Sequence, residues 1–242
     1  MQTPMTLTIT ARLAGRCLGA IVAILASLNL LVLLLERLGH PTLRGLSHML
    51  TMDAEGNLPT LISCVYWLLA ATLAFIIAQV NGKKPRMPDL RWIGLSLIMC
   101  FLALDEFSQL HETLSEPTRK LLGYQHFFVS WILPVGAVTL MIAAFYARLV
   151  LSLPRRTRRL FIASGIVFIS GAAGFEALGN WIGLHTVSPL PYELSAIVEE
   201  TLEMLGVTLL ISSLIAYFED TRQVVAVRIG TRESDRDAGE TS

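Results

Sequence analysis

The sequence is poor in charged residues: Asp, Glu, Lys and Arg make up 16% of its 242 residues, against roughly 25% in a typical soluble domain. This deficit accompanies 53% hydrophobic residues and a mean hydropathy of +0.59. Together these values exclude an ordinary soluble domain and predict an integral membrane protein in contact with lipid. The formal net charge is zero, so no overall positive field attracts nucleic acid, and no nucleic-acid partner is expected.

Cysteine is also scarce, and the short motifs of several enzyme classes are missing. Cys17, Cys64 and Cys100 all lie within apolar runs, where a free thiol behaves as a small hydrophobic side chain. The sequence contains no Gly-x-Ser-x-Gly elbow, no phosphate-binding loop and no Cys-x-x-Cys pair. The patterns typical of serine hydrolases, nucleotide-binding loops and dithiol enzymes are therefore absent.

Long apolar runs dominate what is present. A bilayer core of about 30 Å needs about 20 helical residues, and helices are expected because backbone groups cannot stay unpaired in lipid. The prediction is an all-α bundle of six transmembrane helices spanning residues 1–218, followed by a flexible cytoplasmic tail, 219–242. The six helices are expected at about 15–36, 59–80, 92–113, 127–151, 160–183 and 194–218.

The basic residues predict how these helices are oriented. With six helices, 15 of the 19 Lys and Arg residues fall on one side of the membrane, the side that carries both termini. Because Lys and Arg favour the cytoplasmic side, both termini are predicted to be cytoplasmic. The third and fifth helices then run outward and the sixth runs inward. The four tryptophans, Trp67, Trp92, Trp131 and Trp181, are expected to be anchors at the two membrane interfaces.

Acidic and other polar residues recur in the outer halves of three of these helices. The third contains "LDEFSQLHE", the fifth "FEALGN" and the sixth "VEETLEMLG". At about 100° per residue, Glu199 and Glu203 share a stripe with Ser195 and Gly206. A charge at bilayer depth costs at least about 2.5–3.5 kcal/mol and usually faces the interior of the bundle. The three stretches are therefore expected to line one polar site that opens to the outside.

No Lys or Arg occurs within these stretches, so another cation must offset the acids. Carboxylates with an imidazole suit Zn²⁺, Mn²⁺ or Fe²⁺, and carboxylates alone suit Ca²⁺. A divalent metal is the first hypothesis for the cofactor. Its expected ligands are Asp105, His111, Glu112, Glu176, Glu199 and Glu203, and the expected supporting residues are Glu106, Gln109, Asn180 and Glu200.

Two other interpretations of the acidic residues stay open. Protonated carboxyl groups could form a proton or cation pathway, although the inner halves of the helices offer only scattered Ser and Thr. Alternatively, the acids lie hydrated near the outer interface and have no chemical role. The protein would then be, respectively, a proton- or cation-coupled transporter or a structural subunit. Residue types and spacing do not decide whether it is an enzyme.

Two of these stretches resemble motifs of uncharacterised bacterial multi-pass membrane proteins. One is Leu-Asp-Glu-x-x-x-x-His-Glu, from Leu104 to Glu112, and the other is Glu-Glu-x-x-Glu-x-x-Gly, from Glu199 to Gly206. The resemblance implies a location in a bacterial inner membrane and brings no activity with it. If the protein is an enzyme, the depth of the site predicts a substrate that is a membrane lipid or a lipid-soluble molecule, with the metal polarising it or activating water.

Overall fold

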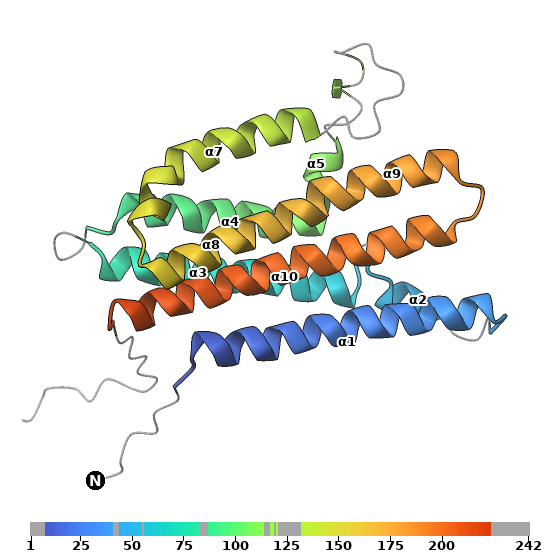
Figure 1. Ribbon diagram of the computed structural model, residues 1–242, viewed down its shortest axis with the longest axis horizontal. Coiled ribbons are helices and arrows are strands. Elements are labelled where there is room, and N and C mark those ends of the chain that lie inside the picture. Colours follow the sequence, from blue (N-terminus) through green and yellow to red (C-terminus); the bar gives the residue numbers. More distant parts are fainter. Residues whose placement is uncertain are drawn as a thin grey trace, which may run out of the picture.

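The computed structural model describes residues 8–40, 44–54, 56–82, 87–113, 117–118, 120 and 132–223, and every regular element in these ranges is helical (Figure 1). The elements are α1 (Ala11–Arg37), α2 (Arg44–Leu50), α3 (Leu58–Val80), α4 (Leu90–Ser108), α5 (Leu110–Thr113), α7 (Ile132–Ser152), α8 (Arg155–Ile169), η2 (Ser170–Phe175), α9 (Glu176–His185) and α10 (Leu190–Asp220). The all-α prediction is confirmed for this part of the chain.

Five stretches of helix are long and apolar enough to cross a membrane. They are Ala11–Arg37, Leu58–Val80, Pro134–Ser152, Arg155–His185 and Leu190–Asp220. The multi-pass character that the sequence predicts is therefore supported by five helices. α4 has 19 residues, as many as Pro134–Ser152, but it carries Arg91, Asp105 and Glu106 near its two ends. Any 18 consecutive residues of α4 therefore include three charged residues, whereas each of the five stretches has an apolar window with two or fewer.

The helix at the centre of the bundle is α10, which packs against α1, α3 and the continuous rod formed by α8, η2 and α9 (Figure 1). α4 packs mainly on α3, and α7 contacts α8 at the edge of the bundle. The face of α3 within the bundle carries small residues, Ala70, Ala74 and Ala78, each fully buried. In lipid, no hydrophobic force drives helices together. Small side chains instead stabilise the bundle by letting the helix backbones pack closely.

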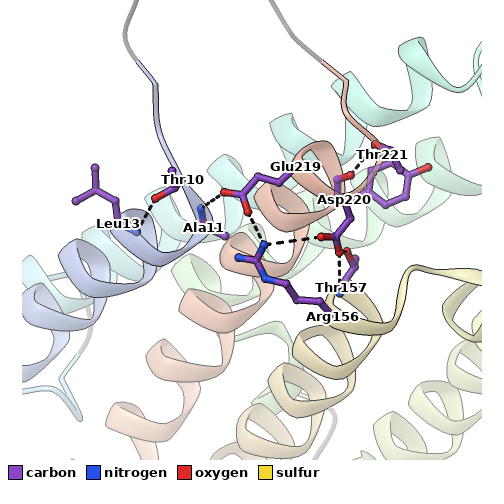
Figure 2. Close-up of polar contacts among 9 residues, drawn as sticks. Thr10, Ala11, Leu13, Arg156, Thr157, Glu219, Asp220 and Thr221 are labelled. Carbon is purple, nitrogen blue, oxygen red and sulfur yellow. Dashed lines mark hydrogen bonds and ion pairs between the residues drawn. The ribbon is translucent and has the colours of Figure 1, made fainter.

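Carboxylates at the C-terminal end of α10 tie together the ends of two other helices, as Figure 2 shows. Glu219 accepts a hydrogen bond from the backbone N–H of Ala11, at the start of α1. Asp220 accepts from the hydroxyl and the backbone N–H of Thr157, in the first turn of α8. Arg156 pairs with both carboxylates. The two acids thus offset the positive N-terminal ends of the dipoles of α1 and α8. The contacts also show that the start of α1 and the end of α10 lie at the same end of the bundle.

These contacts also move a boundary that the sequence predicted. The tail was expected to begin at residue 219, but α10 continues to Asp220, and Glu219 and Asp220 are both engaged. Residues 221–223 follow the helix, and residues 224–242 of the predicted tail lie outside the described residues. In the fourth expected helix, residues 127–131 are likewise outside them, and the described helix begins at Ile132.

Two of the expected helices are not regular. The third was predicted as one helix over 92–113, but α4 ends at Ser108, Gln109 adopts a left-handed conformation with φ 47°, and α5 follows. The fifth runs from Arg155 to His185 with the π-helical turn η2 in its middle. Such single turns of π-helix occur frequently at functional sites. Both irregularities lie next to acidic residues.

Two of the four tryptophans are not interface anchors. Trp67 and Trp92 are 5% and 1% exposed, so they belong to the core and do not face lipid head groups. Trp67 packs edge-on against Phe168, and Trp92 packs against Tyr217. Trp181 is half exposed, and Trp131 lies outside the described residues. The buried pairs join α3 to α8 and α4 to α10.

Candidate carboxylate site

The acidic stripe of α10 faces the rod formed by α8, η2 and α9, and glycines make the approach close. A Cβ atom added to Gly171 of η2 would lie 2.7 Å from the carbonyl oxygen of Glu199 and 2.9 Å from Cγ of Glu203. One added to Gly206 would lie 2.8 Å from the backbone of Phe168. Because a real Cβ essentially never comes this close, both positions require glycine. The rod is therefore held directly against the segment that carries Glu199 and Glu203.

A second close contact continues the same interface toward the N-terminal end of α10. Gly179 of α9 lies against Ser195 of α10, where an added Cβ would be 2.7 Å from the serine Oγ. The Ser195 hydroxyl donates a hydrogen bond to the carbonyl of Tyr192 in its own helix, at 2.8 Å. The stripe of Ser195, Glu199, Glu203 and Gly206 is thus in contact with the rod along its whole length.

Carboxylates from four parts of the chain interact electrostatically with Glu200 and Glu203. Glu200 interacts electrostatically with Glu106, Glu199, Asp53 and Glu176. Glu203 interacts with Glu200, Glu106, Glu199 and Glu176. These groups come from α4, α9, α10 and the segment between α2 and α3. We call the six residues Asp53, Glu106, Glu176, Glu199, Glu200 and Glu203 the carboxylate cluster.

The cluster includes two residues that were predicted only to support the site and one that the sequence patterns did not predict. Glu106 and Glu200 were expected only to support the site, yet both take part in these interactions. Asp53 was not expected at all, because it lies in a short polar segment outside the expected helices. Its position depends on how the segment between α2 and α3 folds, with Met52 held by Asn29 of α1 and lying near Thr201 of α10, and no periodic pattern in the sequence predicts this.

α4 brings Glu106 to the cluster although it packs mainly on α3, and the expected metal ligand Asp105 is not among the groups that interact with Glu200 and Glu203. Asp105 and Glu106, both partly buried, stand in the last turn of α4, just before the left-handed Gln109. His111 and Glu112 lie in α5, and their side chains are outside the described part of the structure. The expected roles of these two residues as metal ligands therefore stay predictions.

Glu176 and Asn180 lie together in α9, as their spacing predicts. Glu176 is the first residue of α9, immediately after η2, and both side chains are partly buried. The amide of Asn180 donates a hydrogen bond to the Glu176 carbonyl at 3.1 Å. Asn180 thus contacts the backbone of Glu176, one turn away.

The helical segments that carry the members of the cluster contain acidic residues but no basic ones. Residues 92–118 and 160–221 contain no Lys or Arg. Near the N-terminal end of α10, Arg37 pairs with Glu193, two turns before Glu200. Within the described residues, no group of three or more His, Cys, Asp or Glu side chains is already arranged to hold a metal ion. The cluster therefore gathers carboxylates without a ready-made coordination shell in the part of the chain that the structure describes.

Comparison with known proteins gives a single family. Residues 17–218 match the family described as "Domain of unknown function (DUF8692)". No curated protein and no solved structure matches the chain. The match covers all the long helices except the first residues of α1 and the last of α10.

Proposed function

We propose that this chain, which belongs to the DUF8692 family, is a six-span membrane protein that binds a cation at its carboxylate cluster. Five helices are long and apolar enough to cross a bilayer. α4 is proposed as the sixth span, because its 19 residues rise about 28 Å at 1.5 Å per residue, close to the thickness of a bilayer core.

The orientation that we propose places both termini in the cytoplasm, in a bacterial inner membrane. The basic segment at the start of α8, which includes Arg155 and Arg156, lies at the same end of the bundle as Ala11 and Glu219 (Figure 2). Basic residues accumulate on the cytoplasmic side of membrane proteins. The carboxylate cluster then lies in the outer half, nearer to the periplasm.

One observation carries the proposal of a cation site: the groups that interact with Glu200 and Glu203 are themselves carboxylates. Several negative charges close together in a medium of low dielectric repel one another strongly. A bound cation removes this repulsion and gains energy from the same field. Two irregular turns, at η2 and Gln109, border the cluster, and irregular backbone at membrane depth is tolerated where it lines a buried or hydrated site.

The first candidate for the cation is a divalent metal, Zn²⁺, Mn²⁺, Fe²⁺ or Ca²⁺, held by some of the carboxylates with His111. Such an ion polarises an oxygen of a substrate or lowers the pKa of a bound water. Because the cluster lies at the depth of the outer leaflet, the substrate proposed for an enzyme is a membrane lipid or a lipid-soluble molecule.

The second candidate is a proton- or cation-coupled transporter that uses the same acids. It is favoured by the lack of a preformed metal group among the described side chains, because protons need no fixed coordination geometry. Acidic residues inside membrane segments often relay protons. A structural subunit, in which the cluster binds nothing, is the third possibility for the same fold.

The experiment is elemental analysis of the detergent-purified protein after incubation with Zn²⁺, Mn²⁺, Fe²⁺ and Ca²⁺ separately. We expect about one ion per chain in the wild type and a large loss in Glu203→Gln, which removes a charge from the centre of the cluster. The matched control is Glu193→Gln, which removes a carboxylate from the same helix at its outer end, where it pairs with Arg37.

Each outcome selects one candidate. A metal that is lost in Glu203→Gln and kept in Glu193→Gln supports the metal site. No metal in the wild type, with a pH-dependent cation flux in proteoliposomes that Glu203→Gln abolishes, supports the transporter. Neither binding nor flux would overturn the proposal of a cation site and leave the structural subunit.

A further inference from the structure

Polar contacts mark the two ends of the pair formed by α1 and α10. At one end, Glu219 accepts a hydrogen bond from the backbone N–H of Ala11. At the other end, Arg37 pairs with Glu193. In each helix 26 residues separate these positions (11 to 37 in α1, 193 to 219 in α10), about 39 Å at 1.5 Å per residue. A bilayer core of about 30 Å, centred between these ends, leaves about 4–5 Å at each.

The segment between α2 and α3 lies well below the end that carries Arg37 and Glu193. Asn29, eight residues before Arg37, accepts a hydrogen bond from the backbone N–H of Met52 at 3.0 Å. Thr201, eight residues after Glu193, has its hydroxyl 4.0 Å from Sδ of Met52. Two helices thus give Met52 the same depth, about 12 Å below that end and about 7 Å inside the bilayer core. Figure 1 agrees, because α1 and α10 both extend past the start of α3.

The backbone of this segment is irregular at a depth where lipid tolerates only regular structure. The described residues 51–54, 56 and 57 lie outside any helix, and Gly56 has φ 63°. Irregular backbone does not face hydrocarbon; it is buried in protein or it lines a water-filled cavity. Met52 is 2% exposed and Asn57 is 4% exposed, so protein covers one side of the segment.

The other side of the segment is open. Asp53 and Gly56 are exposed, and Ala54 is partly exposed. An ionised carboxylate facing hydrocarbon is costly, and so are the backbone polar groups of an exposed irregular turn. The sequence of residues 51–57, TMDAEGN, contains only one large apolar residue, and that residue is the buried Met52. Water is the surrounding that suits the exposed side.

We propose that a water-filled inlet enters the outer half of the bundle, with residues 51–57 as its floor. Through it, small hydrophilic solutes, inorganic ions included, reach the level of Glu200 and Thr201 from the aqueous phase and not through the lipid. The inlet rests on the proposed membrane-spanning arrangement of the helices. It requires no cation site, since it is a route and holds no ligand of its own.

The test is the accessibility of introduced cysteines to a trimethylammonium methanethiosulfonate, a charged thiol reagent that does not enter hydrocarbon. The variants Asp53→Cys and Ala54→Cys are labelled in membrane vesicles that freeze–thawing has opened, so that the reagent reaches both faces. Peptide mass spectrometry locates each label and measures its rate. The native thiols of Cys17, Cys64 and Cys100 therefore stay in place.

Leu31→Cys is the matched control on the lipid-facing side of α1. Leu31 is 49% exposed and follows Asn29 by two residues, so it lies about 200° around the helix from the contact with Met52. It is six residues before Arg37, about 9 Å below that end and thus nearer to the surface than Met52. Val187→Cys, in the fully exposed turn between α9 and α10, gives the rate in water.

We expect Asp53→Cys and Ala54→Cys to react at rates close to that of Val187→Cys. Leu31→Cys should react at least about a hundredfold more slowly, which is the ratio that corresponds to the cost of a charge in hydrocarbon. Reaction at positions 53 and 54 as slow as at position 31 would overturn the inlet. Fast reaction in detergent micelles but slow reaction in membranes would also overturn it, because lipid or another protein would then cover the segment.

The labelling is independent of the proposed cation site, because no ion is added. Fast reaction at positions 53 and 54 in a protein that binds no metal and carries no cation flux would support the inlet and overturn the cation site. Slow reaction in a protein that binds a metal would overturn the inlet alone.

Discussion

Gly171 offers the sharpest test of how η2 packs against the acidic stripe. In Gly171→Ala, the new Cβ would lie 2.7 Å from the Glu199 carbonyl oxygen and 3.1 Å from the backbone nitrogen of Glu203. Both are backbone atoms and cannot rotate away. Reaching an ordinary contact of 3.4 Å requires the two helices to separate by about 0.7 Å. Overpacking of this kind costs about 1–3 kcal/mol of stability.

Gly174 provides a matched comparison within the same turn. It is exposed, and an added Cβ would meet nothing within 4 Å. Both substitutions gain the helix propensity of alanine over glycine, about 1 kcal/mol, so this contribution cancels between the two variants. The difference in the free energy of unfolding between Gly174→Ala and Gly171→Ala should therefore equal the cost of the clash, about 1–3 kcal/mol.

The assay is SDS-induced unfolding of the protein in detergent micelles, followed by far-UV circular dichroism. We expect Gly174→Ala to unfold at the same or a higher SDS fraction than the wild type and Gly171→Ala at a lower one. If both variants unfold at the same point, η2 does not lie directly against Glu199 and Glu203. The reasoning that places the carboxylates of α10 at this interface would then be refuted.

Three further predictions test the packing of α7, the C-terminal end of α10 and the proposed orientation of the helices. Tyr146→Ala, at a buried contact of α7, should lower the free energy of unfolding by about 3 kcal/mol. Leu140→Ala, at an exposed site of the same helix, should lower it by no more than about 0.5 kcal/mol. Equal losses in the two variants would contradict the packing of α7. Asp220→Ala should cost about 1–2 kcal/mol by removing the acceptor for Thr157, and Asp220→Asn, which keeps an acceptor oxygen, should cost less in the same assay. Alkaline phosphatase fused after residue 187 should be active, and fused after the C-terminus inactive; the reverse pattern would contradict cytoplasmic termini.

Much of the fold could be predicted from the sequence because the bilayer imposes strong constraints. Apolar runs of about 20 residues must be helices in lipid, and five of the described helices meet this criterion. The outer acidic stretches could also be recognised, since Glu199, Glu203 and Glu176 interrupt apolar runs. Their periodicity placed Ser195 and Glu203 on one face of α10, where the structure has the contact with η2 and α9.

The irregular backbone could not be read from the sequence. The break at Gln109 divides a stretch whose composition suits one continuous helix, and η2 inserts a wider turn in a run rich in small residues. Local composition does not distinguish either irregular turn from a regular helix. At η2, the structure shows the close approach of Gly171 to the backbone of α10.

The sequence by itself thus determined that the chain forms helices, several of them long and apolar enough to cross a membrane, and that acidic residues interrupt some of the apolar runs. The tertiary structure alone decided which residues meet. In a membrane the lipid and the protein interior are equally apolar, so an apolar face does not reveal whether it contacts lipid or another helix. For this reason Trp67 and Trp92 were expected at the interfaces and lie in the core. For the same reason, only the fold shows that Asn29 holds Met52 and that Asp53 and Glu106 join Glu200.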